Sequence, residues 1–193
     1  MILPTLDLEK KLWNSGYAYV CGTDEVGRGC FAGPVVVGAV IFPKDIVLPE
    51  GIADSKLLKP KTREKLSVEI KKVATAWSIA EISVSHINKL GIGKATQMAF
   101  RKAVKLLTPK ADFVLIDAFY INEFAKQVQR HIKDGDKVCA SISAASIIAK
   151  VYRDNLMKKL HLEFPKYNFF KHKGYGTKEH REAIKKYGLS ELH

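Results

Sequence analysis

The pattern of hydrophobic and polar positions predicts five strands. Runs rich in Val, Ile, Thr and aromatic residues, bounded by turn-forming residues, are typical of strands. Such runs lie at residues 17–23, 34–42, 74–83, 112–117 and, with a weaker pattern, 127–132. The first run is expected to pass into a turn at the charged pair that follows it.

Apolar residues three or four positions apart predict helices at 60–73, 94–107 and 142–162, because this spacing forms one face of a helix. A shorter helix is expected at 177–187, with Thr177 as its N-cap and Gly188 as its stop. Strands come first, helices alternate with them later, and the end of the chain is helical. The predicted fold class is therefore α/β, with a helical C-terminal portion.

Length and composition indicate one globular domain. The chain has 193 residues, of which 47% are hydrophobic and 27% charged, so disorder and low complexity are not expected. We expect residues 1–193 to form a single domain in which 155–193 is a C-terminal helical extension.

Membrane and disulfide classes are not expected. The longest apolar run, 30–42, contains Pro34 and is shorter than the roughly 18 residues of a membrane span. Asp7 and Glu9 lie where a signal peptide would be apolar. The three cysteines form no Cys-x-x-Cys pair, which favours neither a disulfide framework nor a zinc site. We expect a reduced, cytoplasmic protein.

The charge indicates a polyanionic partner. Lys and Arg number 32 against 20 Asp and Glu, which gives a net charge of +12. Residues 150–186 alone hold eleven Lys and Arg and four acids, with aromatic residues between them. Cations that neutralise phosphates and rings that stack on sugars or bases suit a nucleic acid. Solvated helix faces with a few core aromatics would have a similar composition.

Two adjacent carboxylates, Asp24 and Glu25, follow the first predicted strand. Neighbouring strand residues point to opposite faces, so both can serve one site only if the chain bends or one uses its carbonyl group. The segment Gly27-Arg28-Gly29 beside them has backbone groups that can approach a ligand closely. An ordinary charged turn is the alternative.

Two further carboxylates strengthen the case for a site. Asp117 ends an apolar strand, and Asp136 just precedes an apolar helix. Four carboxylates in a basic chain suit the hard cations Mg²⁺ and Mn²⁺, two of which, about 4 Å apart, can support phosphodiester hydrolysis. P-loop, EF-hand and His-Glu-x-x-His patterns are not found, and His172 and His180 are expected on a basic surface rather than on a metal.

Six motifs in order resemble the type 2 ribonucleases H, the ribonuclease HII family. They are Asp24-Glu25-Val26-Gly27-Arg28-Gly29 with Ala32-Gly33-Pro34-Val35, Asp54-Ser55-Lys56-x-Leu58, Asp117, Gly135-Asp136, the segment from Ser143 to Asp154, and His172-Lys173-Gly174-Tyr175-Gly176-Thr177. The matches span residues 17 to 181, nearly the whole chain.

The resemblance implies a ribonuclease H-like fold, with a mixed five-stranded sheet flanked by helices. It implies cleavage of the RNA strand of RNA–DNA hybrids, and cleavage 5′ of ribonucleotides embedded in duplex DNA, as in ribonucleotide excision repair. The expected products carry 3′-hydroxyl and 5′-phosphate ends. The implied partners are thus hybrids and ribonucleotide-containing DNA, and the implied cofactor is Mg²⁺ or Mn²⁺.

The resemblance also implies roles for individual residues. The metal-binding catalytic set comprises Asp24, Glu25, Asp117 and Asp136. The groups implied to contact the ribonucleotide are Gly27, Arg28, Gly29 and Tyr175, with Tyr175 on the sugar, where the 2′-hydroxyl distinguishes RNA from DNA. The implied phosphate contacts are Lys56, Ser146 and Lys150.

One position departs from the family pattern. Lys133-Asp134-Gly135-Asp136 stands where Lys-Gly-Asp is usual, and Asp136 is preferred because it keeps seven residues to Ser143, with Asp134 as a possible substitute. Asp154 is interpreted as structural. The type 3 relatives have an added N-terminal domain and a small residue in place of Arg28.

Two other functions are compatible with these residues. A non-catalytic hybrid-binding protein would use the acids only as turn residues. A nuclease of the same fold that cuts all-DNA substrates, such as a junction resolvase, is the other alternative. The sequence after the last predicted helix has no sliding-clamp motif, and we expect a monomer.

Overall fold

The computed structural model describes residues 3–53, 55–56 and 58–193, so Asp54 of the second motif lies outside the described residues. The strands are β1 (Val20–Val26), β2 (Val35–Ile41), β3 (Ala76–Ile82), β4 (Phe113–Asp117) and β5 (Gln129–Ile132). The helices are α1 (Asp7–Asn14), α2 (Pro60–Val73), α3 (Val84–Leu90), α4 (Ile92–Leu106), α5 (Gly135–Val138), α6 (Ala140–Glu163), α7 (Phe169–His172) and α8 (Lys178–Tyr187), with single 3₁₀ turns η1 (Lys126–Val128) and η2 (Pro165–Tyr167).

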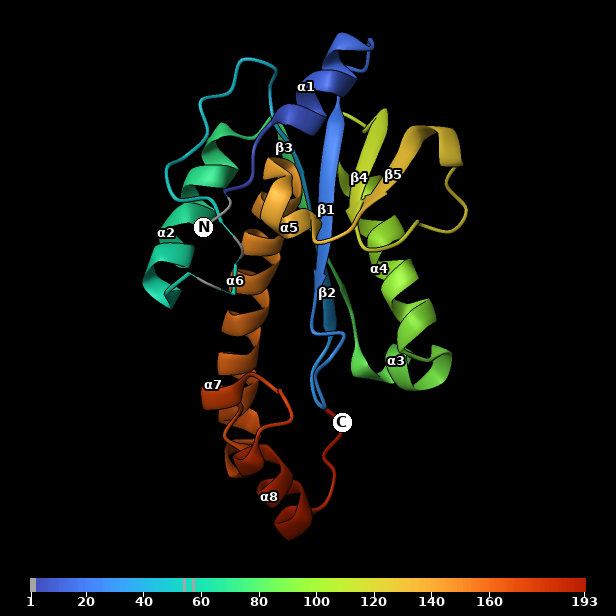
Figure 1. Ribbon diagram of the computed structural model, residues 1–193. Coiled ribbons are helices and arrows are strands. Elements are labelled where there is room, and N and C mark those ends of the chain that lie inside the picture. The colour runs from blue at the N-terminus through green and yellow to red at the C-terminus, as the bar shows by residue number, and fades with distance from the viewer. Residues whose placement is uncertain (1–2, 54, 57) are drawn as a thin grey trace.

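The five strands form one mixed sheet in the order β3-β2-β1-β4-β5, which confirms the expected sheet (Figure 1). β1 pairs antiparallel with β2 and parallel with β4. The pairs between β1 and β4 run from Val20 with Phe113 to Thr23 with Ile116. β1 therefore continues for three residues beyond the last of these pairs, and the candidate site lies at this end of the sheet.

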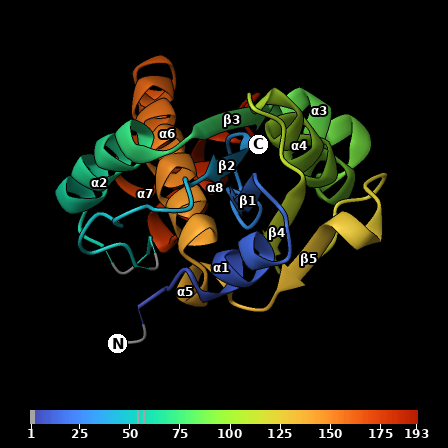
Figure 2. The same ribbon diagram turned by 90° about the horizontal axis from the view of Figure 1, so that it is seen from above.

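Helices cover both faces of the sheet: α6 and α2 pack on one face, and α3 and α4 on the other (Figure 2). Successive residues of β1 alternate between the two layers. Val20 belongs to the apolar cluster that includes Ile142 and Ile147 of α6, whereas Cys21 belongs to the cluster that includes Phe100 of α4. This alternation fixes which side of the sheet each later residue of β1 faces.

Two glycines let α6 lie directly on the sheet. A Cβ atom at Gly22 would lie 2.2 Å from the carbonyl carbon of Ser141, and one at Gly38 would lie 2.4 Å from the carbonyl oxygen of Ala145. Any larger residue would push the helix away from β1 and β2. The close approach brings the next part of α6, including Ser146, to the end of β1.

The N-terminal segment holds the start of α6. The buried Glu9 of α1 accepts a hydrogen bond from the Ser141 amide at 2.8 Å, where a helix N-terminus favours negative charge. Thr5 donates its amide to the carbonyl of Val138 and accepts a hydrogen bond from Ala140. α1 thus fixes the junction between α5 and α6.

The structure confirms α2 at its expected bounds and the Thr177 cap of α8, whose hydroxyl accepts a hydrogen bond from His180 N. The expected turn at Asp24 is wrong, because β1 continues to Val26. Sequence reasoning did not find α1, α3, α5 and α7, which are at most eight residues long. α6 continues across residue 155, the expected start of the C-terminal portion.

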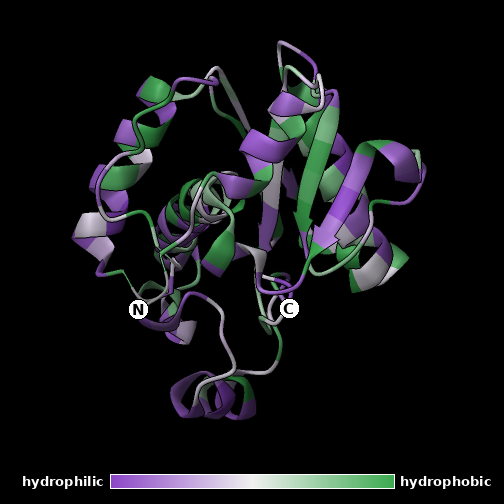
Figure 3. Ribbon diagram, turned by 45° about the horizontal axis from the view of Figure 1, so that its top comes forward, coloured by the Kyte–Doolittle hydropathy of each residue, from purple (hydrophilic) through white to green (hydrophobic). Residues whose placement is uncertain are grey.

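The C-terminal helix α8 is mostly hydrophilic, whereas β4 of the sheet is mostly hydrophobic (Figure 3). Among the described residues, no helix combines the length and the apolar character that crossing a membrane requires.

Candidate active site

Asp24 and Glu25 lie inside β1, opposite Gly38 and Val37 of β2. Asp24 is only 5% exposed and faces the α6 layer, whereas Glu25 faces the other layer. Both nevertheless line one pocket. Neither a bend nor a carbonyl ligand is needed for this, because the site is built around the end of β1 beyond its last pair with β4.

Asp117 and Asp136 approach from the next segments of the chain. Asp117 is the last residue of β4, and its Oδ1 accepts a hydrogen bond from the Gly135 amide at 2.7 Å. Asp136 follows in the first turn of α5 and is 3% exposed. Asp134 is exposed and forms an ion pair with Lys137 at 2.7 Å. The geometry thus favours Asp136 over Asp134 as the fourth carboxylate.

The carboxylates act on one another electrostatically. Burial raises the pKa of Asp24 well above its usual value, and the negative charges of Glu25, Asp117 and Asp136 raise it further. A hydrogen bond with Ser146 of α6 opposes this rise. The charges of three other acids therefore act on one buried carboxylate.

Burial also raises the pKa of the two neighbouring acids. The pKa of Glu25 rises to about 7, mainly through burial, and the positive charge of Arg28 limits the rise. The pKa of Asp117 is raised by burial, against the hydrogen bond from Gly135. Burying several negative charges together is energetically costly, and a bound cation would neutralise part of this charge.

The carboxylates open into a pocket of about 200 Å³ with a basic rim. Its lining residues are Asp24, Glu25, Val26, Gly27, Arg28, Gly29, Ser55, Lys56, Ser146, Lys150 and Tyr175. Every predicted substrate contact therefore lies at this pocket, together with two of the four carboxylates. The Lys56 ammonium lies 3.6 Å from Asp136 Oδ2, and the Arg28 guanidinium lies 3.7 Å from Glu25 Oε1.

Side chains on the rim are held by further contacts. The Arg28 guanidinium lies 5.0 Å from the ring centroid of Phe119, a residue that sequence reasoning missed. The Lys150 ammonium lies 5.0 Å from the ring centroid of Tyr175. Ser146 is buried, and its hydroxyl lies 2.9 Å from that of Ser55.

The donor set suits Mg²⁺ or Mn²⁺, because it consists of carboxylate oxygens from β1, β4 and α5. In the part of the chain that the structure describes, no three His, Cys, Asp or Glu side chains already form a closed ligand set for an ion. The positive charge beside Asp136 is the ammonium group of Lys56. The chemistry of the residues fits a divalent ion.

Comparison with known proteins decides the family, because the family model for Ribonuclease HII matches residues 21–193. The chain belongs to the ribonuclease HII family. It is 43% identical to the Ribonuclease HII of Alkaliphilus oremlandii (strain OhILAs) over 197 residues, which cover 99% of this chain and 96% of that relative.

Solved structures have the same fold. The ribonuclease H2 from Pyrococcus horikoshii OT3 superposes with a TM-score of 0.75 and is 24% identical, over 90% of this chain and 91% of that one. Bst-RNase HIII in complex with Mn²⁺ superposes with a TM-score of 0.66 and is 19% identical, over 91% of this chain and 64% of that one. The expected ribonuclease H-like fold is confirmed.

Membership of the ribonuclease HII family makes the chain a ribonuclease H, an enzyme that cleaves the RNA strand of RNA–DNA hybrids. The hypothesis of a purely binding protein is thereby contradicted. Among the described residues, each of the six family motifs supplies a residue to the active-site pocket or to the carboxylates beside it.

A buried arginine, whose role sequence reasoning missed, joins two of these family motifs. Arg153 of α6 is fully buried and donates hydrogen bonds to the carbonyl groups of Ala32, Pro34 and Lys173 at 2.8–2.9 Å. The Gly-Arg-Gly loop and the loop that holds Tyr175 are therefore fixed to the same helix. Asp154 is structural, as expected, because it pairs with Arg63 and Lys150.

The expectation that His172 and His180 lie on a basic surface is wrong. His172 is 6% exposed, His180 is fully buried, and their rings stack with centroids 4.4 Å apart. They pack against Phe169, an apolar residue of α7. The charged residues around them in the sequence gave no sign that these imidazoles face inward.

Proposed function

We propose that the chain is an endonuclease that cleaves the RNA strand of hybrids and also cleaves 5′ of single ribonucleotides embedded in duplex DNA. The observation that carries the proposal is that four carboxylates from β1, β4 and α5 lie beside one basic pocket. Two of them line the pocket, Lys56 of its rim contacts Asp136, and Asp117 bonds the amide of the residue before Asp136. The basic rim attracts the phosphate backbone of the substrate, and the carboxylates at the centre bind cations.

We propose that Asp24, Glu25, Asp117 and Asp136 hold two ions of Mg²⁺ or Mn²⁺. Such ions would activate the attacking water and stabilise the leaving 3′ oxygen, and the products would carry 3′-hydroxyl and 5′-phosphate ends. The raised pKa values of three of these acids support this role, because negative charge that is poorly solvated gains most from a cation. The complex of Bst-RNase HIII with Mn²⁺ supplies an analogy from the same fold.

Recognition of the ribonucleotide is proposed for the loop of Gly27, Arg28 and Gly29 and for Tyr175 across the pocket. The 2′-hydroxyl is both a donor and an acceptor, and backbone groups can meet both needs. Gly27 has a φ of +103°, which suits glycine, and a Cβ there would lie 2.3 Å from Arg153 Nε. The Tyr175 ring is 38% exposed and so is available to a sugar.

Phosphate contacts are proposed for Lys56 and Lys150 at the rim. Ser146 was predicted as a third contact. Its hydroxyl is buried beside Ser55 and bonds to Asp24, so we propose that it acts mainly by holding that carboxylate. We also propose that residues 1–193 act as one catalytic domain in which 155–193 is the helical extension.

The setting proposed is ribonucleotide excision repair in the cytoplasm. Cys21, Cys30 and Cys139 are all free, which is compatible with a reducing compartment. The monomeric state stays a prediction.

The decisive experiment offers three labelled substrates to the purified protein with Mg²⁺ or Mn²⁺. They are an RNA–DNA hybrid, duplex DNA with one ribonucleotide, and all-DNA duplex. We expect cleavage of the first two, with a cut on the 5′ side of the lone ribonucleotide. Cleavage of all-DNA duplex at a similar rate would support a resolvase-like enzyme instead.

A substitution at the buried carboxylate tests the site. Asp24→Asn should abolish cleavage and leave hybrid binding largely unchanged, because Asn keeps the shape but not the charge. The matched control is Asp45→Asn, which makes the same change at an exposed position. Full activity in the Asp24 variant would refute the proposed centre.

A substitution at the exposed ring tests recognition of the ribonucleotide. Tyr175→Ala should reduce the preference for ribonucleotide-containing DNA over all-DNA duplex.

A further inference from the structure

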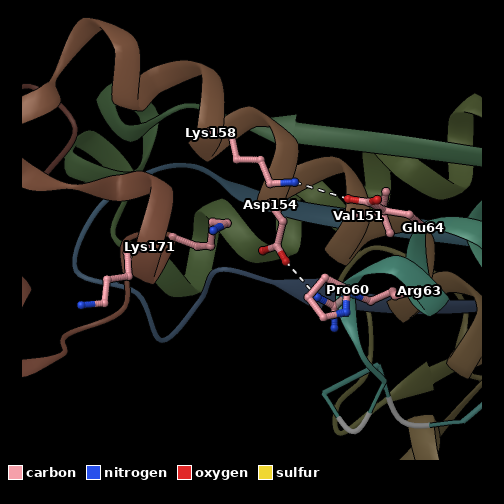
Figure 4. A pocket seen from close by; sticks show the side chains of 8 residues that line it. Pro60, Arg63, Glu64, Val151, Asp154, Lys158 and Lys171 are labelled. Atoms are coloured by element: carbon pink, nitrogen blue, oxygen red, sulfur yellow. Dashed lines mark hydrogen bonds and ion pairs between the residues drawn. The ribbon is translucent and has the colours of Figure 1, made fainter.

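A second basic pocket lies next to the active site, between α2, α6 and the segment that follows α6 (Figure 4). It has a volume of about 250 Å³ and is lined by Pro60, Arg63, Glu64, Val151, Asp154, Lys158, Lys171 and Lys173. Four cationic side chains thus face two carboxylates. None of the lining residues belongs to the active-site pocket.

The carboxylates of this pocket are already engaged. Asp154 lies 3.1 Å from Arg63, and Glu64 lies 3.3 Å from Lys158, as Figure 4 shows. Burial lowers the pKa of Lys173, and the charges of Lys158 and Arg63 lower it further, against the charge of Asp154. The pocket therefore concentrates positive charge that its own acids do not cancel.

The backbone at Lys173 is fixed in an unusual conformation. Its φ is +53°, in the left-handed region that non-glycine residues rarely adopt. Its carbonyl group accepts a hydrogen bond from the buried Arg153 at 2.8 Å, which holds the residue in place. A residue fixed in this unfavourable backbone conformation has a defined side-chain direction, and such residues are concentrated at binding sites.

The two pockets are connected through one carboxylate. Asp154 pairs with Arg63 in the second pocket and, at 2.8 Å, with Lys150, which lines the active site. Lys150 and Lys158 are eight residues apart on α6, which corresponds to about 12 Å of helix. This distance equals the axial rise of about three to four nucleotides in a duplex strand, at roughly 3.4 Å each.

We propose that this second pocket binds a backbone phosphate of the nucleic-acid substrate, about three to four nucleotides from the cleaved bond. The proposal rests on the proposed function, since it assumes that the scissile phosphate occupies the first pocket. Lys158 and Lys173 supply the charge and α2 supplies a helix N-terminus at Pro60. The Lys171 side chain is 70% exposed, so it contributes less than the more buried cations.

Equilibrium binding without divalent ions tests the pocket separately from cleavage. The variant combines Lys158→Gln and Lys173→Gln, and the probe is a long DNA duplex with one central ribonucleotide. We expect about tenfold weaker binding, the effect of one lost charge-assisted contact. The slope of log K against log salt should fall by about 1. The matched control combines Lys102→Gln and Lys105→Gln, which removes two charges from the exposed face of α4 and should change binding less than twofold.

Shortening the duplex supplies the second arm. When the duplex ends two nucleotides from the ribonucleotide on one side, the wild type and the double variant should bind equally. Shortening on the other side should leave the tenfold difference. An undiminished difference on both shortened duplexes, or no difference on the long one, would overturn the proposal. Lys158→Gln alone, on the surface of α6, gives the same test if the double variant folds poorly.

A phosphate titration separates the two sources of a phosphate group. If inorganic phosphate at millimolar concentration stabilises the wild type but not the variant, and hybrid affinity is equal in both, the pocket is a site for the free anion and the proposal fails. A wild type that binds hybrids through this pocket but cleaves none would refute the proposed function and leave the phosphate site standing.

Discussion

The Asp117 carboxylate accepts a hydrogen bond from the Gly135 amide at 2.7 Å, and this contact joins the end of β4 to the start of α5. It explains how acids far apart in the chain meet. Asp117 is placed by the sheet, and Asp136 follows Gly135 in the first turn of α5. Part of the convergence therefore comes from a backbone contact rather than from the acids themselves, which repel one another.

Asp117 both accepts the Gly135 hydrogen bond and carries a negative charge in the site, and Asp117→Asn separates these two roles. The amide oxygen can still accept the Gly135 hydrogen bond, but the negative charge is lost. We expect cleavage to fall by at least about 100-fold, equivalent to ~2.7 kcal/mol in the barrier. The midpoint of thermal unfolding without metal should stay equal or rise, because repulsion within the site is relieved. A clear drop in that midpoint would show that the charge itself is needed for folding.

The choice between two nearby acids is tested by a pair of variants. Asp136→Asn should abolish cleavage, because Asp136 is buried and its charge acts on Asp24. Asp134→Asn should keep activity within about twofold, because the pair of Asp134 with Lys137 lies at the surface. Steady-state cleavage of one hybrid by both proteins provides the comparison. The reverse ranking would move the fourth carboxylate to Asp134.

Sequence reasoning located the site better than it located the strand that carries it. Asp117 was placed correctly at a strand end because apolar runs mark buried strands well. Asp24 and Glu25 were assigned to a turn because charged residues interrupt an apolar pattern. In the fold they extend the strand, since β2 supplies antiparallel partners as far as Val26. Local pattern cannot show a partner strand that follows later in the chain.

The helical end of the chain was harder to predict. Arg153 lies in a run of charged residues and nothing local distinguishes it from its exposed neighbours, yet it is fully buried. The carbonyl groups that satisfy it belong to segments about 20 and 120 residues away, which only the fold brings near. His172 and His180 were misassigned for the same reason. Burial of polar residues depends on long-range partners.

Arg153→Lys measures the value of the buried guanidinium. A lysine can reach few of the three carbonyl groups that Arg153 bonds, and it leaves the others without donors. We expect the free energy of unfolding to fall by about 3–5 kcal/mol in urea titrations. The control Arg181→Lys, an exposed change on α8, should alter stability by less than about 0.5 kcal/mol. Equal stability of the two variants would contradict the anchoring role.

Acid should loosen the segment around Tyr175, because a proton on His172 would disrupt its buried hydrogen bonds. His172 Nε2 donates to the Tyr167 carbonyl, and its Nδ1 accepts a hydrogen bond from the Gly174 amide. A proton on Nδ1 would face that amide and also the stacked ring of His180. Burial accordingly lowers the pKa of His172 below its usual value, and the charge of His180 adds to this effect.

A row of hydrogen bonds connects the Tyr175 carbonyl to the end of the chain. His180 Nδ1 donates to the Tyr175 carbonyl, so its Nε2 accepts a hydrogen bond from His193. His193 Nδ1 in turn accepts from the Ser190 amide, and burial lowers the pKa of His193. Protonation at any of these rings breaks a contact in a row that ends at the Tyr175 backbone.

The direction of the pH effect follows from these lowered pKa values. A histidine whose pKa is lower in the folded than in the unfolded chain adds stability above about pH 6.5 and loses it as the pH falls. Hydrogen exchange at α8 and around Tyr175 should therefore be faster at pH 5.5 than at pH 7.5, after correction for the intrinsic rate. His172→Gln keeps a donor for the Tyr167 carbonyl and cannot gain a proton, so it should weaken this pH dependence. His86→Gln, at an exposed position of α3, should leave the dependence as in the wild type. If His172→Gln also left it unchanged, the imidazole of His172 would not be the group that acid disturbs.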